Sequence, residues 1–206
     1  FLGQAGLLED EYQTQHHYYH FLQQEYRFLK HKYNLQPLPS HIFKRLRLRP
    51  NATPHIKLVE LAAIWIKHGT LFSNILEAKT IREIKDYFRV SPSIFWETHY
   101  QFKQKTHSCK KQIGENALNI LLINTVAPLL FAYGKARHLP ECQERALKLL
   151  ERMPPEQNYI ITSFRQTGIE VKNAGDTQAL IQLKREYCEK KRCLYCRFGF
   201  QLLKQS

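Results

Sequence analysis

Acidic residues are scarce in this 206-residue chain relative to basic ones. It contains 18 Asp and Glu against 31 Lys and Arg, which gives a formal net charge of +13 at pH 7. Such an imbalance favours an anionic partner, such as nucleic acid, a phosphate-bearing ligand or an acidic protein. Excess lysine also keeps proteins soluble, so the positive charge could serve solubility alone and be unrelated to any binding partner.

Long hydrophobic runs are scarce as well. The longest, residues 118–133, is shorter than a comfortable membrane span and contains Asn119, Asn124 and Pro128, so it predicts a buried core helix. The chain begins at Phe1, without a methionine and without the basic and apolar regions of a signal peptide. We therefore expect no membrane partner, and a chain that is part of a longer one. The five cysteines do not form the pattern of a secreted disulfide framework, so we expect a cytoplasmic protein.

The motifs of several enzyme classes are absent. The sequence contains no G-x-x-x-x-G-K-[ST], no G-x-G-x-x-G and no G-x-S-x-G, which argues against a nucleotide-hydrolysing or serine-esterase site. Glu97 and His99 lie two residues apart, but an acid and a histidine need a third, orienting group to form an acid–base pair. No catalytic residue is predicted, and an independent enzyme is the least favoured function.

What the sequence does contain is helical periodicity with marked helix ends. The 43% hydrophobic and 12% aromatic residues suffice for a folded core. Apolar residues recur at helical spacing, and Thr53, Thr80 and Gly168 are typical of helix ends. We expect an all-α fold, a multi-helix bundle of helical hairpins with short irregular loops. A single domain over residues 1–206 is favoured, and two small helical subdomains sharing an interface are the alternative.

The expected helices follow from this periodicity. They span residues 9–33, 40–46, 54–68, 71–78, 81–88, 118–133, 140–153 and 155–166, with a last helix capped by Asn173 or Asp176. Pro128 predicts a kink, because it deprives the Asn124 carbonyl of its helical donor. Residues 169–171 predict a brief extended segment.

Basic residues cluster at three places in this scaffold. Arginine presents a planar fork of donors that suits phosphate, so a loop with several arginines predicts an anion site. Lysines near Trp96 and Tyr100 raise the hypothesis of base stacking, although aromatic residues more often complete a core. Structural ion pairs are the other alternative. The predicted nucleic-acid contacts are Lys44, Arg45, Arg47, Arg49, Lys110, Lys111, Lys190, Lys191 and Arg192.

Three of the five cysteines form a C-x4-C-x2-C pattern near the C-terminus, which does not resemble the disulfide framework of a small secreted domain. Cys193 and Cys196 can reach one tetrahedral metal, and Cys188 lies one turn earlier, so the pattern predicts a zinc site. The spacing is also typical of an iron–sulfur cluster, whereas reduced structural thiols are favoured because no fourth ligand is evident. Candidate fourth ligands are Cys109, Cys142, His107 and His138.

A weaker metal signal lies near the N-terminus. His16 and His20 are spaced i, i+4 with His17 adjacent, a spacing that can hold a transition metal on a helix. No carboxylate completes the motif, so an exposed polar helix face is the favoured interpretation.

Five phrases of the sequence together resemble a known family. They are Phe1-Leu-Gly-Gln-Ala-Gly-Leu, Phe28-Leu-Lys-His-Lys-Tyr, Arg45-Leu-Arg-Leu-Arg-Pro50, Leu121-Leu-Ile-Asn-Thr-Val and Tyr187-Cys-x4-Cys-Leu-x-Cys-x2-Gly199. They resemble the C-terminal half of an uncharacterised bacterial family, domain of unknown function 2851. Members of that family carry an N-terminal half with phrases similar to restriction-endonuclease-type nucleases. The resemblance implies a non-catalytic portion of a nuclease-like protein, and it transfers no catalytic residue.

These observations lead to two expectations about function. The first is an accessory domain that binds nucleic acid through the phosphate backbone, with the protein's own N-terminal half as a further partner. The alternative is a protein-interaction or packing module whose basic charge is incidental. Structural zinc, and less so an iron–sulfur cluster, are the cofactors that the cysteines suggest.

Overall fold

The described part of the chain consists of helices and loops. The computed structural model describes residues 1–8, 16–44, 47–48 and 52–205. Within these ranges it contains α-helices, 3-10 turns and π-helical turns, and one isolated bridge between His99 and Lys105 takes the place of any strand. The all-α prediction is therefore confirmed, while the short extended segment expected at residues 169–171 forms no strand.

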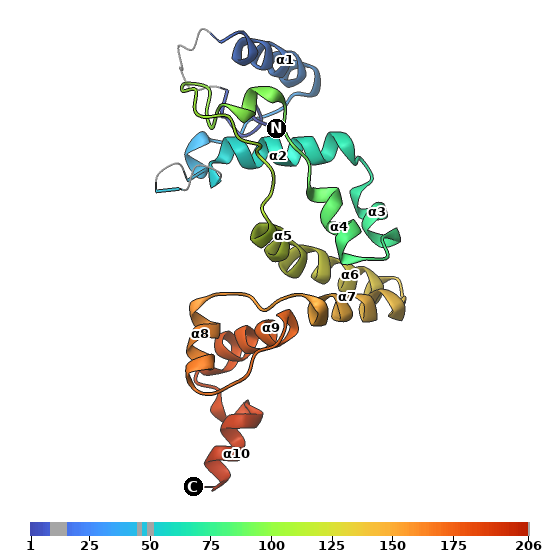
Figure 1. Cartoon of the computed structure of the whole chain (residues 1–206), viewed down its shortest axis with the longest axis vertical. Helices are drawn as coiled ribbons and strands as arrows, with labels where there is room; N and C mark the ends of the chain where they lie inside the picture. The colour runs from blue at the N-terminus through green and yellow to red at the C-terminus, as the bar shows by residue number, and fades with distance from the viewer. Residues whose placement is uncertain (9–15, 45–46, 49–51, 206) are drawn as a thin grey trace. The chain divides into compact units, whose positions relative to one another are not determined.

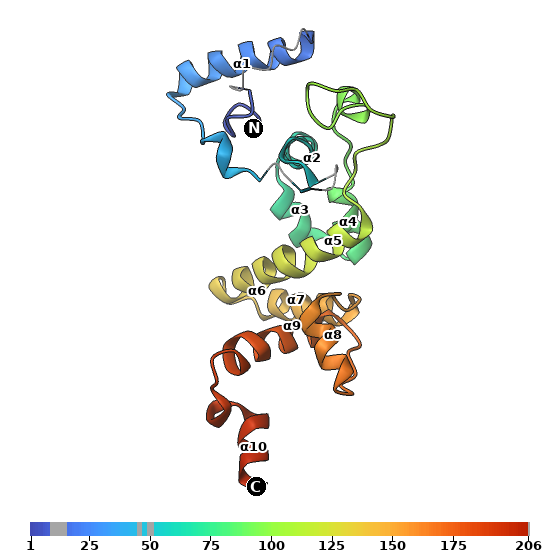
Figure 2. The ribbon, with the colours of Figure 1, turned by 90° about the vertical axis from the view of Figure 1, so that its left-hand side faces the viewer.

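The chain divides into two compact units, residues 1–114 and 115–206. Unit 1 contains α1 (His17–Tyr33), η1 (Ser40–Ile42), α2 (Pro54–Lys67), α3 (Leu71–Glu77), α4 (Ile81–Phe88) and η3 (Ile94–Glu97) (Figure 1). Unit 2 contains α5 (Glu115–Leu121), η4 (Leu122–Val126), α6 (Ala127–Ala136), α7 (Pro140–Arg152), α8 (Tyr159–Gln166), α9 (Ala174–Gln182), η5 (Leu183–Cys188), η6 (Cys193–Tyr195) and α10 (Arg197–Gln205) (Figure 2). The expected single domain stays a prediction.

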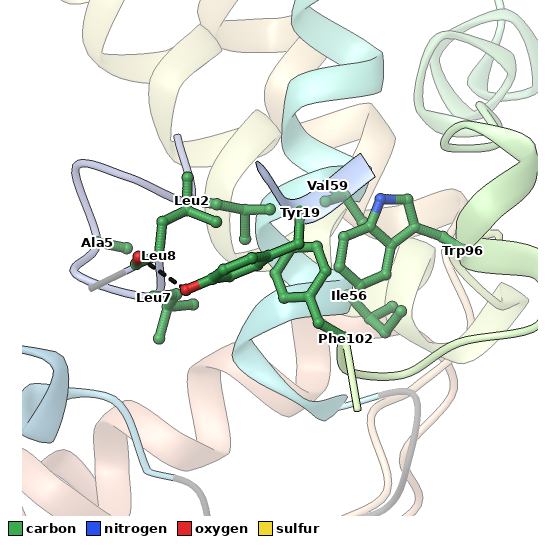
Figure 3. Packing of buried hydrophobic residues seen from close by; sticks show 9 residues of the cluster. All are labelled: Leu2, Ala5, Leu7, Leu8, Tyr19, Ile56, Val59, Trp96 and Phe102. Carbon is green, nitrogen blue, oxygen red and sulfur yellow. Dashed lines mark hydrogen bonds between the residues drawn. The ribbon is translucent and has the colours of Figure 1, made fainter. Parts of the chain in front are cut away.

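The core of unit 1 joins the N-terminal segment to α1, α2 and the loop after α4. Its buried members are Leu2, Ala5, Leu7, Leu8, Tyr19, Ile56, Val59, Trp96 and Phe102 (Figure 3). Tyr19 is buried, and its hydroxyl group keeps a hydrogen-bond partner because it donates to the carbonyl oxygen of Leu8 at 2.9 Å. Trp96 is 1% exposed, which confirms that this aromatic residue completes the core. The short apolar lead-in is therefore an integral part of the fold.

Two glycines let the N-terminal segment approach its neighbours closely. A Cβ atom at Gly3 would lie 2.1 Å from Cγ of the Tyr26 ring. Gly6 has φ +66°, and a Cβ atom there would lie 2.4 Å from the carbonyl oxygen of Leu38. The Leu38 amide donates to the Gln4 carbonyl at 2.8 Å, which ties the segment to the chain beyond α1. Packing therefore explains both glycines of the first quoted phrase.

Helix α1 is shorter than the sequence predicts. It begins at His17, where the ring of His16 accepts a hydrogen bond from the Tyr18 amide as an N-cap, and residues 9–15 lie outside the described ranges. Tyr18, Leu22 and Tyr26, which recur at helical spacing, pack on the core, but Tyr33 at the helix end is 59% exposed. The apolar stripe is thus only partly used by unit 1.

The ends of the next helices mostly follow the predicted caps. Thr53 occupies the N-cap of α2, and the Thr80 hydroxyl accepts from the Glu83 amide at 3.1 Å in the expected capping box. Helix α2 ends at Lys67 with His68 as its C-cap, so Gly69 directly follows the helix end, and its φ is not positive. The chain enters α3 two residues later without a left-handed turn. Of the helix expected over residues 40–46, the described residues 40–44 form a single 3-10 turn, η1 (Ser40–Ile42), and residues 45–46 lie outside the described ranges.

The most apolar helix is interrupted where the sequence predicts a kink. Pro128 cannot donate a backbone hydrogen bond, so the Asn124 carbonyl lacks its usual partner. The backbone adopts the π-helical turn η4, in which the Ala127 amide donates to the Leu122 carbonyl five residues back. The proline is therefore accommodated by a wider turn inside a continuous helical stretch.

One helix of the described part, Glu115–Ala136, is long and apolar enough to cross a membrane by length and composition. The mean hydropathy of its most apolar 18-residue window is 1.6, and 39% of that window is buried. A core helix of a soluble protein meets the same criteria. Leu118, Leu122 and Leu130 have no exposed surface, which supports the predicted core role.

Four helices of the described part end in the same way. The residues that end them are Asn34, His138, Gly168 and Lys191, with φ of 49°, 56°, 87° and 52°. At each, the residue's own amide donates to the carbonyl three residues back, and the following amide donates five residues back. This is the Schellman arrangement, which usually places glycine at the left-handed position. The sequence predicts only the Gly168 example.

Unit 2 contains a helical hairpin with a close backbone approach. Helices α6 and α7 lie side by side in both views (Figures 1 and 2). A Cβ atom at Gly134 in α6 would lie 2.8 Å from the Leu139 carbonyl oxygen. Helix α8 begins at Tyr159 and not at residue 155, because the Asn158 side chain caps it by accepting from the Ile161 amide at 3.1 Å.

Candidate nucleic-acid interface

The predicted phosphate contacts fall into two groups, one in each unit. Those that the structure describes as exposed are Lys44, Arg47, Lys110, Lys190, Lys191 and Arg192. Arg45 and Arg49 lie outside the described residues. The three lysine and arginine residues of unit 2 are consecutive, so they form one local cationic surface. The unit 1 residues come from separate loops, before α2 and before α5.

Lys111 is the predicted contact that the structure contradicts. It is 2% exposed, so phosphate cannot reach it as the fold stands. Its Nζ donates to Sγ of Cys109 at 2.7 Å and to the Glu97 carbonyl at 3.3 Å, and it lies 3.8 Å from the centre of the Tyr100 ring. A buried ammonium needs such partners to offset its lost hydration. Lys111 is therefore a structural cation, whereas its neighbour Lys110 is exposed.

The same contacts set Cys109 apart from the other cysteines. Hydrogen bonds from the Lys111 ammonium and with the Tyr100 hydroxyl, 3.5 Å away, lower the pKa of the Cys109 thiol below its usual value. The residue is exposed, so solvent and reagents can reach its sulfur atom. Sequence reasoning considered Cys109 only as a fourth metal ligand. It missed the pairing because the surrounding loop has no helical period from which burial could be read.

The unit 2 cations lie at the C-terminal end of a long helix. Helix α9 continues through the π-helical turn η5, and the Schellman arrangement at Lys191 closes it. Cations are stabilised there by the partial negative charge of the helix terminus. Lys190 forms an ion pair with Glu186, and this hydrogen bond lowers the pKa of the Glu186 carboxyl. Within the described part, Lys191 and Arg192 form no ion pair, so both remain available for an anionic partner.

The C-terminal cysteines are not gathered into a metal site. Among the described residues, no three His, Cys, Asp or Glu side chains are placed to hold a metal ion. Cys188 and Cys193 are exposed, whereas Cys196 is 8% exposed. A Cβ atom at Gly199 would lie 2.6 Å from the Cys193 carbonyl oxygen, so α10 rests directly on the turn η6. Packing therefore accounts for Cys196 and Gly199, and the zinc and iron–sulfur predictions gain no support.

The other titratable pairs have structural contacts. The His16 ring caps α1 and makes an edge contact with Phe95, with ring centres 4.7 Å apart. Nδ1 of His99 lies 2.9 Å from the Phe95 carbonyl oxygen, and the His99 ring stacks on the Phe95 ring at 4.0 Å. These contacts hold the loop after α4 against α1.

Sequence reasoning missed one feature of the C-terminal segment. Large apolar side chains alternate there with cations and are exposed to solvent. They are Leu194 (70%), Tyr195 (83%), Phe198 (66%), Phe200 (53%) and Leu203 (54%). The sequence carries a signal for it, because aromatic residues stand beside Arg192 and Arg197, in the same stretch as the C-x2-C pattern. A cationic surface and an aromatic surface thus share one segment.

Comparison with known proteins identifies a family and nothing finer. Residues 1–159 match the family described as protein of unknown function (DUF2851). The chain belongs to the DUF2851 family. No curated protein and no solved structure matches the chain. The DUF2851 match confirms the family predicted from the sequence, whereas the placement of the chain in the C-terminal half of that family stays a prediction. The match ends before α9 and α10, so the phrase from Tyr187 to Gly199 lies outside it.

Proposed function

We propose that this DUF2851 chain is a helical accessory module that binds nucleic acid through the phosphate backbone. The observation that supports this most directly is the exposed run of Lys190, Lys191 and Arg192 at the end of a helix. Its setting in a larger, nuclease-like protein rests on the resemblance stated above.

Phosphate binding follows from the charge and from the local geometry. Lysine and arginine that contact phosphates release condensed counterions, so such binding weakens steeply as salt rises. The formal net charge of +13 supplies long-range attraction for a polyanion. Backbone hydrogen bonds of the Schellman arrangement fix the main chain that carries Lys191 and Arg192, which lowers the backbone entropy lost when this segment binds.

A second candidate function is a protein-interaction or packing module. Helix α1 favours it, because Phe28 and Tyr33 are 63% and 59% exposed on a helix whose other side packs on the core. Exposed apolar side chains of this kind are typical of surfaces that bind another protein. This function predicts little affinity for DNA or RNA.

Charge-matched variants test the proposed function. The variant Lys191→Gln with Arg192→Gln removes two cations that have no ion pair in the described part of the chain. The control variant Lys135→Gln with Lys148→Gln removes two exposed cations of the same unit, one from α6 and one from α7. Each variant lowers the net charge by the same amount. A difference in nucleic-acid binding between the two variants therefore depends on where the cations lie and not on total charge.

The expected readout is the dependence of binding on salt. For duplex DNA of about 20 base pairs, the first variant should lower the slope of log K against log salt by about 1.8, because each phosphate contact contributes about 0.9. The control should retain nearly the whole slope. Equal slopes for both variants and the unaltered chain would reject this site, and absence of binding by the unaltered chain would reject the function.

A further inference from the structure

The C-terminal segment, residues 190–204, offers two kinds of contact at once. Its cations are Lys190, Lys191, Arg192, Arg197 and Lys204, and Glu189 is the neighbouring acid. Between them stand the exposed rings of Tyr195, Phe198 and Phe200. A binding partner that matches this surface must therefore present both negative charge and flat apolar faces.

The structure holds these rings apart on a fixed support. Phe198 and Phe200 flank Gly199, which rests on the Cys193 carbonyl, so the two rings point to either side of that contact. Side chains next to each other along a helix diverge by about 100°. The amide of Phe200 donates to the Cys196 carbonyl at 2.8 Å, which joins α10 to the turn before it.

A pocket lies beside Phe198. It has a volume of about 380 Å³ and is lined in part by Leu180, Leu183, Tyr187 and Phe198. Two acids, Glu170 and Asp176, also line it. Glu170 pairs with Lys172, and Asp176 accepts from the Lys172 amide at 2.8 Å, so both carboxylates already have local partners. A flat ring entering the pocket would meet aromatic and aliphatic side chains.

We propose that residues 190–204 bind single-stranded nucleic acid in preference to duplex, with bases stacked on Tyr195 and Phe198 and phosphates held by Lys191, Arg192 and Arg197. This inference rests on the proposed function and names its substrate class. Single strands expose the faces of their bases, whereas a duplex buries them in its stack. Stacking on aromatic side chains tolerates any base sequence, so the surface selects strandedness and not sequence.

An anionic lipid surface would also offer charge and apolar contact, but the geometry favours a single strand. A helix that lies in a membrane interface needs an unbroken apolar face. The centre of the apolar face of α10 is Gly199, and it is covered by the chain's own turn at Cys193. The exposed rings stand on both sides of that contact, which suits separate bases better than a lipid layer.

Ring-deleting variants test the inference with the 206-residue chain. Tyr195→Leu and Phe198→Leu keep apolar side chains but remove the faces on which bases stack. The matched control is Phe28→Leu with Tyr33→Leu, which removes two rings of similar exposure from α1. The probes are an oligonucleotide of about 20 thymidines, a 20-base-pair duplex and vesicles that contain phosphatidylglycerol. Circular dichroism confirms that each variant is folded.

The expected result is a loss of single-strand affinity on the order of tenfold for each C-terminal ring removed, because stacking contributes about 1–3 kcal/mol per base. Duplex affinity and the control variant should change little. If the unaltered chain binds both nucleic acids equally and the variants do not alter this, the inference fails while the proposed function stands. Binding to neither nucleic acid rejects both. Tighter binding to vesicles than to the oligonucleotide overturns the inference in favour of a lipid surface.

Discussion

Replacing Lys191 tests the strained helix end and the cationic surface together. Lys191 has φ +52°, a left-handed conformation that costs an L-residue about 1–2 kcal/mol. Glycine adopts this conformation without strain but loses about 0.5–1 kcal/mol more in backbone entropy on folding. Both Lys191→Gly and Lys191→Gln remove the charge, so their difference isolates the backbone. We expect the glycine variant to be more stable than the glutamine variant by about 0.5–1 kcal/mol.

Thermal denaturation followed by circular dichroism measures this difference. For a chain of this size it corresponds to a melting temperature about 1–4 °C higher for Lys191→Gly than for Lys191→Gln. Lys190 supplies the control, because it precedes the left-handed residue and its φ is not positive. The Lys190→Gly variant should therefore be less stable than the Lys190→Gln variant. Both Lys191 variants should reduce the salt slope of nucleic-acid binding equally. Equal melting of the Lys191 pair, or the same order at both positions, would refute the left-handed helix end.

Three further outcomes follow from other parts of the structure. Gly3→Ala should lower the stability measured by urea unfolding by about 1–3 kcal/mol or more, because the new methyl group strikes an aromatic ring; an unchanged midpoint would contradict the close approach. Hydrogen bonds from the N-terminus of α4 lower the pKa of the Glu83 carboxyl in the folded protein. The ionised carboxylate therefore stabilises the fold at any pH above its pKa in the unfolded chain, and this stabilisation is lost as the pH falls through its lower pKa in the folded protein. On acidification, the free energy of unfolding should therefore fall less for the Glu83→Gln variant than for the unaltered chain. Parallel pH profiles of the unfolding free energy would count against this. Iodoacetamide should alkylate Cys109 at lower pH than an ordinary thiol. The variant Lys111→Met should raise the midpoint of this pH profile, whereas Lys110→Met should not. Equal effects of the two variants would exclude the pairing of Lys111 with Cys109.

Sequence reasoning succeeded where local chemistry determines structure. Thr80 and Asn173 carry side chains that cap helices, and the structure shows both caps. Pro128 lacks a donor wherever it stands, so an interruption of the helix was predictable. The π-helical form of that interruption was not, because it depends on how the surrounding apolar residues pack.

Predictions failed where tertiary contacts determine the burial or the backbone conformation of a residue. Lys110 and Lys111 are equivalent in the sequence, yet one is exposed and the other is buried against Cys109. The left-handed residues His138 and Lys191 carry no turn signal of their own, since surrounding hydrogen bonds impose their conformation. The cationic run at the C-terminus was predictable from composition, whereas the exposure of Tyr195 beside it required the fold.

The most direct test of nucleic-acid binding is a titration of the 206-residue chain with short single- and double-stranded DNA and RNA at several salt concentrations, with an acidic protein as the control ligand. We expect binding to nucleic acid that weakens steeply and linearly in log K against log salt, and much weaker binding to the acidic protein. Negligible affinity for every nucleic acid at low salt would contradict the account and leave the chain as a packing or protein-interaction module.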